Sequence, residues 1–304
     1  MAPQQALMTR VGYAAAQIAG ALAGYQVGDR LPPLGTLAAT LGCGVGTIQA
    51  AIKLLEDNGA ITVEARGHLG SFLTKMNHVA LWEFAGNKSV SISMPLPYTL
   101  RYEGLATGIM SAFQAHQLPL SLMYLRGSVA RVQALKEGRT DYAIMSGLAA
   151  AATPGIEVVY DLGPESYVGS HAIIVEKGRS LKDPNLRIGV DSASTDVVNL
   201  VAKVFGDIPP KRLVNISYNQ VDRSFLTGAI DATVWNADEI SDRFSAAVDI
   251  YPIADLTSDA NTRAVVVRAS SPDPAPIAVL DTLKDPLVTK TAALVMDGTI
   301  LPTY

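Results

Sequence analysis

The hydrophobic pattern of this 304-residue chain changes near residue 88. Before that point, apolar residues recur at helical spacing and end in one short alternating hairpin; after it, short apolar strands alternate with amphipathic helices. One domain usually takes about 100–200 residues. We therefore predict two domains, residues 1–76 and residues 89–304, joined by a linker at 77–88. With 49% hydrophobic and 17% charged residues, the chain has enough apolar material for a core in each domain.

Composition limits the kinds of partner that the chain can bind. The net charge is −4, and residues 1–76 carry five basic against four acidic side chains. Any contact with DNA must therefore come from a few well-placed cations. The single cysteine, Cys43, rules out an intramolecular disulfide. No apolar run reaches the roughly 18 residues that a membrane span requires, so we expect no membrane segment and a cytoplasmic protein.

The first domain is predicted to be a winged helix-turn-helix. An amphipathic helix is expected over residues 4–23, a short helix over 34–41 and another from Val45 to about Asn58. The run Gly42-Cys43-Gly44 breaks the last two helices apart, and a hairpin follows with its tip at Arg66–Gly70. Two short helices joined by a glycine-containing turn are the arrangement that places the second helix in the major groove.

Five polar side chains of this domain are predicted to contact DNA. Three of them, Thr47, Gln49 and Lys53, are expected opposite the apolar stripe of the second short helix. Glutamine can form two hydrogen bonds to adenine, through the oxygen and the nitrogen of its side-chain amide. Arg66 and His68 stand at the hairpin tip, where a wing meets the phosphate backbone or the minor groove.

Over about residues 5–75 the domain resembles the GntR-type winged-helix domain of bacterial transcription regulators. The resemblance rests on the following residues: Gly24-Tyr25, Gly28, Leu31-Pro32, Leu37-Ala38, Leu41-Gly42, Thr47, Leu55-Glu56, Gly59, Arg66-Gly67 and Gly70-Ser71-Phe72. Three family segments differ here. Pro33-Leu34-Gly35 replaces Ser-Glu-Arg, Gly44-Val45 replaces Ser-Arg, and Gln49 replaces an arginine. Because each lost arginine removes a DNA contact, two interpretations stay open: a DNA-binding head, or a degenerate head that mediates dimerisation or protein contacts.

The second domain is predicted to be α/β with two similar lobes. Helices are expected between most of the following strands, which indicates βαβ units and a mostly parallel sheet: residues 90–94, 118–124, 142–145, 188–190, 214–217 and 232–235. Asp141 and Asp231 each stand three residues after a helix-ending glycine and directly before a buried strand. The two copies of this pattern lie 90 residues apart, which suits two lobes.

This leucine–glycine–aspartate pattern resembles the type 2 periplasmic-binding-protein fold, which also serves as the effector domain of many bacterial regulators. Together with Arg66-Gly67-His68-Leu69-Gly70 and Ile188-Gly189-Val190-Asp191, it makes nearly the whole chain resemble the YhfZ family of proposed transcriptional regulators. The resemblance implies ligand-controlled transcription, and it does not identify the ligand.

Candidate effector contacts follow from this two-lobed fold, because ligands bind between the lobes, at the carboxyl ends of strands and near helix N-termini. The segment Asp191–Thr195 follows a strand and opens a helix, so its hydroxyls and N–H groups favour an anion, with Arg101 or Arg126 opposite. Ser and Thr also serve simply as helix caps. Asp191 and Asp196 would oppose an anion and favour an amine group instead. An amino-acid-like metabolite fits both. The predicted contacts are Ser93, Arg101, Arg126, Ser128, Ser146, Asp191, Ser192, Ser194, Thr195 and Trp235.

We expect no catalytic residue, metal or cofactor. The four histidines lack metal-ligand spacing, and the chain contains no nucleophile-elbow or Walker motif. The leading hypothesis is a dimeric transcription regulator with operator DNA and a small polar or anionic effector as partners. The alternatives are a cytoplasmic small-molecule sensor whose head binds protein, and a solute-binding or enzymatic body with an incidental head.

Overall fold

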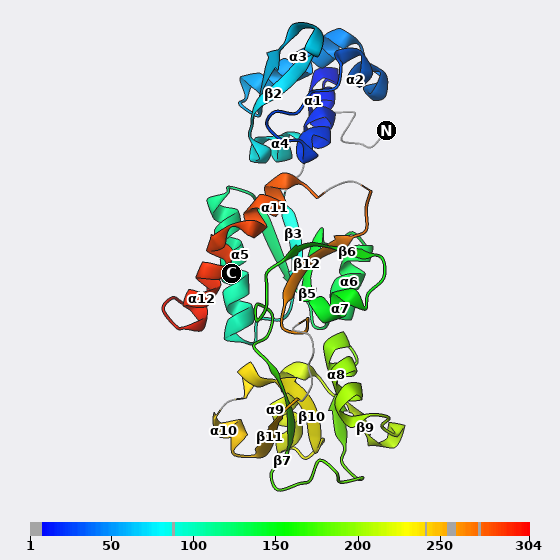
Figure 1. The fold of residues 1–304 in the computed structure, drawn as a ribbon, viewed down its shortest axis with the longest axis vertical. Helices are drawn as coiled ribbons and strands as arrows, with labels where there is room; N and C mark the ends of the chain where they lie inside the picture. Colours follow the sequence, from blue (N-terminus) through cyan, green and yellow to red (C-terminus); the bar gives the residue numbers. More distant parts are fainter. Residues whose placement is uncertain (1–7, 87–88, 241, 254–259, 273–274) are drawn as a thin grey trace. The chain divides into compact units, whose positions relative to one another are not determined.

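The computed structural model describes residues 8–86, 89–240, 242–253, 260–272 and 275–304. The chain divides into two compact units. The first contains Met1–Val90, Ala112–Leu120 and Ser271–Asp285, and the second contains Ser91–Ser111, Ser121–Ser270 and Pro286–Tyr304. Figure 1 shows the elements of each unit, coloured along the sequence. The winged helix lies in the first unit, and almost all of the two larger sheets lies in the second.

The first unit contains the predicted winged helix-turn-helix. Its elements are α1 (Arg10–Ala21), η2 (Leu22–Gly24), α2 (Leu34–Leu41), α3 (Val45–Asp57), β1 (Ile61–Ala65), η3 (Gly67–Leu69) and β2 (Ser71–Met76). The helices and the hairpin are therefore confirmed, although α1 begins at Arg10 and residues 4–7 of its predicted range lie outside the described residues. Thr9 begins α1, because its Oγ1 accepts a hydrogen bond from the Gly12 N–H at 3.1 Å. Ile18, Ile48 and Leu55 form the centre of the core.

The predicted linker contains a helix, α4 (His78–Phe84), which begins after Asn77. The Asn77 side chain accepts a hydrogen bond from the Ala80 N–H at 3.1 Å, and Leu81 is buried in the winged-helix core. Helix α11 (Ile277–Lys284), from near the end of the chain, packs against α4 within the same unit. This part of the linker is therefore a packed helix, as the apolar residues of the segment indicated.

The first large sheet has five strands in the order β4-β3-β5-β12-β6. These strands and their helices are β3 (Val90–Met94), α5 (Leu100–Ala115), β4 (Leu120–Tyr124), α6 (Ser128–Lys136), β5 (Tyr142–Ser146), α7 (Gly147–Ala151), β6 (Ile156–Asp161), β12 (Ala264–Ala269) and α12 (Pro286–Met296). Figure 1 shows α6 and α7 on one side of this sheet and α5 and α12 on the other.

The second large sheet also has five strands, in the order β11-β7-β10-β8-β9. The elements of this lobe are β7 (His171–Glu176), β8 (Ile188–Val190), α8 (Thr195–Phe205), η4 (Pro210–Arg212), β9 (Leu213–Asn215), η5 (Tyr218–Gln220), α9 (Val221–Leu226), β10 (Ala232–Asn236), η6 (Ala237–Glu239), α10 (Asp242–Ser245) and β11 (Val248–Pro252). The two predicted lobes are thus present, each built on one sheet.

Both sheets are mixed, so the expectation of a mostly parallel sheet is corrected. Strand β3 runs parallel to β5, and β8 runs parallel to β9 and β10. By contrast, β12 is antiparallel to β5 and β6, and β7 is antiparallel to β10 and β11. The antiparallel strands are the ones that flank the two lobe crossings, between β6 and β7 and between β11 and β12. A strand that carries the chain out of a lobe needs no helical crossover, so it can pair antiparallel.

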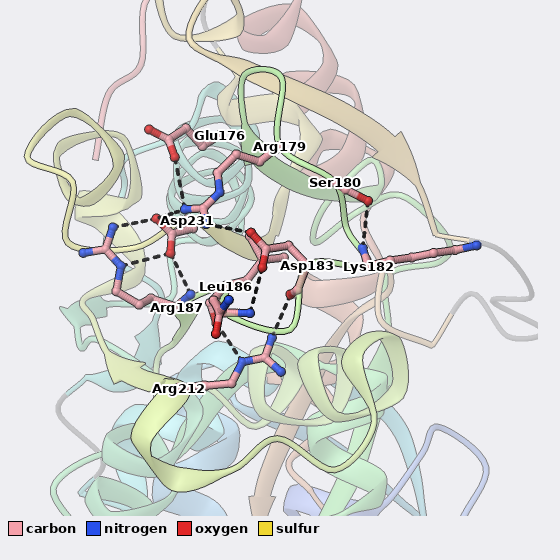
Figure 2. Close-up of polar contacts among 10 residues, drawn as sticks. Glu176, Arg179, Ser180, Lys182, Asp183, Leu186, Arg187, Arg212 and Asp231 are labelled. Carbon is pink, nitrogen blue, oxygen red and sulfur yellow. Dashed lines mark hydrogen bonds and ion pairs between the residues drawn. The ribbon is translucent and has the colours of Figure 1, made fainter.

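The repeated aspartate has the same structural task in both lobes. Asp141 precedes β5 and accepts a hydrogen bond from the Ser91 N–H at 2.8 Å, at the start of β3. Asp231 precedes β10 and accepts one from the Arg187 N–H at 2.7 Å, at the start of β8. Figure 2 shows that Asp231 also lies between the guanidinium groups of Arg187 and Arg179. Each aspartate therefore joins the starts of two neighbouring parallel strands.

Among the described residues, no single helix is long and apolar enough to cross a membrane. Helices α2 and α3 together have the length and the apolar composition of a membrane span, but the chain bends by 104° between them.

Candidate functional site

The winged helix has a groove of about 390 Å³ between α3 and the hairpin. Gln49 and Lys53, one helical turn apart on the exposed side of α3, line this groove, together with Arg30 from the loop before α2. These two residues of the predicted DNA-reading set therefore share one surface.

Thr47 does not lie on that surface. It is half-buried and lines a separate pocket beside Tyr13 and Cys43. At 3.6 residues per turn, Thr47 and Gln49 point about 160° apart around the helix axis. The expectation that Thr47 shares a face with Gln49 and Lys53 is thus corrected by the periodicity of the helix.

The two predicted wing residues are exposed at the hairpin tip. His68 lies in η3, and Arg66 stands directly before it. The Arg66 guanidinium forms an ion pair with Glu64 at 2.8 Å and lies 4.8 Å from the centroid of the Phe72 ring. On α3, Lys53 forms a similar exposed pair with Asp57 at 2.9 Å. Exposed pairs of this kind are weak, so both cations can exchange an acid for a phosphate.

Arg30 is a candidate DNA contact that the sequence analysis did not select. Its backbone pairs with Phe72 of the wing, and its guanidinium lies over Gly70. A Cβ at Gly70 would come within 2.6 Å of Arg30 Nε, and the φ of +94° at Gly70 also favours glycine. The signal available in the sequence was the position of Arg30 before Leu31-Pro32, in the turn that leads into α2.

The second unit contains a cleft between its two lobes, with a cavity of about 50 Å³. Its lining combines charged, hydroxyl and aromatic side chains from the loops after β3, β4 and β8 and from the first lobe crossing. Of the predicted effector contacts, four line this cavity: Arg126, Ser128, Asp191 and Ser194. The structure therefore places four of the ten predicted contacts on one cavity, and their role as effector contacts stays a prediction.

The predicted residues in this region contact one another across the cleft. Arg126 Nη1 donates to Asp191 Oδ2 at 2.7 Å, and the hydroxyls of Ser128 and Thr195 are 2.9 Å apart. Gly127 permits this approach, because a Cβ there would overlap the carbonyl oxygen of Ala193 in the opposite lobe. Its φ of +79° is also one that other residues rarely adopt. The lobes are therefore in direct contact along this side.

A second contact across the cleft involves a buried acid. Ser146 Oγ donates to Asp196 Oδ1 at 2.6 Å, and it also accepts from the Ala149 N–H at the start of α7. Asp196 is 8% exposed and lines the cavity. Burial raises the pKa of Asp196 to about 6, although the Ser146 hydrogen bond and the charge of Arg131 act in the opposite direction. This carboxyl group therefore titrates near neutral pH.

Arg131 is the main cleft residue that the sequence analysis did not select. It is 2% exposed, donates through Nη1 to the Leu125 carbonyl oxygen at 2.9 Å and through Nη2 to Tyr167 Oη at 3.0 Å. Its Nε has no hydrogen-bond partner among the described residues. Arg131 lies three residues after Ser128 on α6, so helical spacing from that predicted contact would have found it.

Four tyrosines form one wall of the cavity. The ring centroids of Tyr98 and Tyr102 are 5.5 Å apart, those of Tyr102 and Tyr167 are 5.2 Å apart, and those of Tyr98 and Tyr218 are 6.3 Å apart. Burial raises the pKa of both Tyr102 and Tyr167 above the ordinary value. The phenols of Tyr102 and Tyr167 are therefore neutral, and the four rings give the cleft an aromatic side.

Two predicted contacts lie in lobe cores. Ser93 is fully buried in β3, where its hydroxyl bonds to the Tyr142 carbonyl oxygen at 3.4 Å. Trp235 packs its ring 5.2 Å from Phe244 in the core of the second lobe. Both point into a core because side chains alternate between the two faces of a strand, so both leave the candidate set.

Two other predicted contacts bind protein groups outside the cavity. Arg101 Nε bonds to Asp238 Oδ2 at 2.9 Å, and its Nη1 bonds to the Glu165 carbonyl oxygen. Ser192 is exposed, and its Oγ bonds to Asn215 at 3.1 Å. Arg101 therefore ties the two lobes together, and Ser192 fixes the loop after β8.

Ser194 caps helix α8, because its Oγ accepts from the Val197 N–H at 3.4 Å. Ser128 Oγ, from the opposite lobe, accepts from the Thr195 N–H at 3.3 Å. Capping, which the sequence left as an alternative to ligand binding, is thus the observed contact of Ser194. Among the described residues, no three His, Cys, Asp or Glu side chains are grouped so that they could hold a metal ion.

His171 lies at the first lobe crossing and also lines the cavity. Its Nδ1 lies 2.8 Å from the Asn261 amide nitrogen, which belongs to the returning crossing. Burial lowers the pKa of His171 to about 4. The ring is therefore neutral at physiological pH and joins the two crossing segments.

Two family models match different parts of the chain. The family model of the YhfZ C-terminal domain matches residues 77–304, and that of a helix-turn-helix domain matches residues 26–73. The uncharacterized protein YhfZ of Escherichia coli strain K12 is 34% identical over 255 residues, which cover 83% of this chain and 83% of that protein. The helix-turn-helix match does not extend to the GntR-type resemblance, which stays a prediction.

Solved structures support the fold. The crystal structure of YhfZ from Shigella flexneri is 29% identical, has a TM-score of 0.61, and covers 75% of this chain and 98% of that one. An ancestral arginine-binding protein bound to arginine has a TM-score of 0.50 at 16% identity, covering 69% of this chain and 97% of that one. The latter likeness concerns the fold alone. The predicted helix-turn-helix and periplasmic-binding-protein-like architecture is thus confirmed.

Proposed function

Because the chain belongs to the YhfZ family, we propose that it is a ligand-responsive transcription regulator. In this proposal the winged helix binds operator DNA, and the cleft between the two lobes binds a small polar or anionic metabolite. The family and the helix-turn-helix match support a regulator with an effector-binding domain. The protein acts by binding, without a catalytic step, and does so in the cytoplasm where the chromosome lies.

The observation that carries the DNA-binding half is the groove of the winged helix. Gln49 and Lys53 lie on the exposed side of the second helix of the helix-turn-helix, and Arg30 lines the same groove from the wing side. In helix-turn-helix proteins this helix contacts base edges while flanking cations bind phosphates. We assign base reading to Gln49 and phosphate contacts to Arg30, Lys53 and Arg66. Since such regulators read paired half-sites, we expect a homodimer.

The experiment that tests DNA binding is a salt titration. Fluorescence anisotropy of the full chain with DNA from upstream of its own gene should give an affinity that falls steeply from 50 to 200 mM salt. Arg30→Ala should reduce the slope of log K against log salt by about 1. Lys75→Ala is the matched control, because it removes an exposed cation of β2 that does not line the groove. Equal slopes for both variants would contradict the assignment of Arg30.

A second candidate function is a metabolite sensor whose head binds protein. The charge balance of the head favours it, because residues 1–76 carry only five basic against four acidic side chains and so offer few cations to phosphates. The same titration separates the two functions. An affinity for DNA that is absent, or unchanged between 50 and 200 mM salt, would favour this second candidate.

A further inference from the structure

We propose that the effector is a small carboxylate, whose negative charge faces Arg131 and whose capture brings one proton from solvent onto Asp196. This inference rests on the proposed function only in taking the cleft as the effector site. It adds the chemical class of the ligand, its size and a proton that is taken up with it.

The charge of Arg131 is the first argument. The guanidinium is 2% exposed, yet the hydrogen-bond acceptors that it reaches are a carbonyl oxygen and a phenol, both neutral. Its Nε–H donates to no acceptor among the described residues. A buried charge is costly unless it is paired and hydrogen-bonded. A ligand that brings an anionic acceptor into this cavity supplies both.

The carboxylates of the cleft are the second argument, because they are already engaged by donors of the protein. Asp191 accepts from Arg126 at 2.7 Å, from the Tyr218 N–H at 2.8 Å and from the Ala193 N–H at 2.9 Å. It therefore has little left to offer an amine. The pair Arg126–Asp191 also sums to zero charge, which leaves Arg131 and Asp196 to set the charge that a ligand meets.

The proton follows from this balance. If Asp196 stays ionised, it cancels the charge of Arg131 and repels an incoming anion; if it is protonated, the cleft has one net positive charge. Asp196 faces Ser146 of β5, Arg131 of α6 and Tyr167 of the first crossing, and His171 and the Arg126–Asp191 pair line the same cavity. The buried histidine is neutral. Asp196 is thus the group that can take up the proton, and burial already raises its pKa to about 6.

The size of the cavity is the third argument. With the lobes in contact its volume is about 50 Å³. One water needs roughly 10–15 Å³ on this measure, so the cavity holds roughly three to five water-sized groups. That corresponds to a ligand of roughly three to five non-hydrogen atoms. A dianion such as phosphate would fit by size, but it exceeds the single unpaired positive charge. The tyrosine wall accepts the carbon atoms of the ligand.

The test is calorimetric titration of the full chain with acetate, propionate and glycolate. At pH 7, titrations in buffers of different ionisation enthalpy should show uptake of close to one proton for the best of the three. Its affinity should fall by up to about tenfold per pH unit above pH 6. Propionamide, the neutral isostere, should not bind. Three results would each overturn the proposal. The first is stronger binding of alanine with an affinity that rises with pH, and the second is a preference for phosphate. The third is no binding of the three carboxylates at concentrations up to about 10 mM, ten times a typical millimolar Kd.

Two variants sharpen this test. Asp196→Asn should still bind the carboxylate, but without proton uptake and without the pH dependence. The neutral amide of asparagine does not accept a proton in this pH range. Arg131→Gln should abolish binding, whereas Arg139→Gln, which removes an exposed guanidinium of the same lobe, should not. Thermal unfolding of each variant checks that the lobe still folds. Carboxylate binding by the Arg131→Gln variant, or proton uptake by the Asp196→Asn variant, would refute the assignment.

The outcome can be separated from that of the proposed function. If an amine or a sugar releases the protein from DNA while carboxylates fail, the effector class is wrong and the regulator stands. If carboxylates bind with proton uptake while DNA binding shows no salt dependence, the effector class stands and the regulator fails.

Discussion

Replacing Asp196 by asparagine should stabilise the second unit at pH 7.5, because the native carboxylate is then ionised inside the cleft. Burial raises the pKa of Asp196 to about 6, whereas an aspartate in an unfolded chain titrates at about 3.9. When the folded-state pKa is raised, the stability contributed by the group is complete below the unfolded pKa and is lost as pH rises through the folded pKa. About 2 pKa units correspond to about 3 kcal/mol. Asp196→Asn should regain about 1–3 kcal/mol of this, depending on the cost of its unpaired amide N–H.

The profile below neutral pH provides a second signature, because His171 opposes Asp196. Burial lowers the pKa of His171 to about 4, so the folded state keeps the ring neutral while the unfolded chain protonates it below about pH 6.5. The free energy of unfolding therefore falls by up to about 3 kcal/mol as pH drops from about 6.5 to about 4. In the native chain the two contributions have opposite signs over this range and nearly cancel. In Asp196→Asn only the His171 contribution remains, so its stability should fall more steeply.

Urea unfolding followed by tryptophan fluorescence measures both effects. A Trp82→Phe background leaves Trp235, which lies in the core of the second lobe beside Phe244, as the reporter of that lobe. Asp297→Asn is the control, because hydrogen bonds from the side chain and the backbone N–H of Thr299 lower the pKa of the exposed Asp297 and reverse the sign of its effect. Equal stability of Asp196→Asn and the parent at pH 7.5, with parallel profiles between pH 4 and 6.5, would refute the reasoning.

Three further predictions concern single contacts. Gly127→Ala should weaken carboxylate binding by about tenfold, since its methyl group would overlap the Ala193 carbonyl oxygen and an alanine at positive φ costs about 1–2 kcal/mol. Calorimetry measures the loss of carboxylate affinity, and an unchanged affinity for DNA is the control. Gly70→Ala should displace the guanidinium of Arg30 and lower the affinity for DNA by about tenfold, or about 1.4 kcal/mol. Fluorescence anisotropy measures this affinity, and an unchanged value would contradict the assignment of Arg30 as a phosphate contact. Asp231→Asn should lower the free energy of unfolding by about 2–3 kcal/mol, because it weakens ion pairs with two arginines. Asp141→Asn weakens only contacts to Ser91, so it should lower the free energy of unfolding less in the same urea assay.

The sequence was sufficient for elements with a strong local pattern. The two short helices of the winged helix were predicted close to their observed bounds, because caps, apolar spacing and turn glycines all act within a few residues. The Asp141 and Asp231 pattern also identified two lobes correctly, since each aspartate joins the same two positions of its own sheet. Strand β12 was not predicted: it pairs with β5 across a separation of more than 100 residues, and no local periodicity encodes such a pairing.

The cleft was located from strand ends, but its members were predicted unevenly. Ser93 and Trp235 occupy strands, where alternation sends a side chain either to the cleft or to the core, and both point into the core. Thr47 shows the same limit on a helix, because a difference of two residues turns a side chain almost to the opposite face. Direction within an element, rather than the type of residue, decided these cases.

The sequence rule selected the side chains that hold the cleft together, which explains why it passed over the residue best placed to hold a ligand. Hydroxyls and acids at helix starts are chosen because they find partners easily, and here Ser128, Ser146 and Asp191 find them in the opposite lobe. A ligand needs the reverse, a buried polar group whose partners inside the protein are incomplete. Arg131 meets that condition with its Nε, and it stands inside a helix whose sequence contains no binding motif. Helical spacing from Ser128 could have pointed to Arg131 as a neighbour, but its incomplete hydrogen bonding is seen only in the folded cleft.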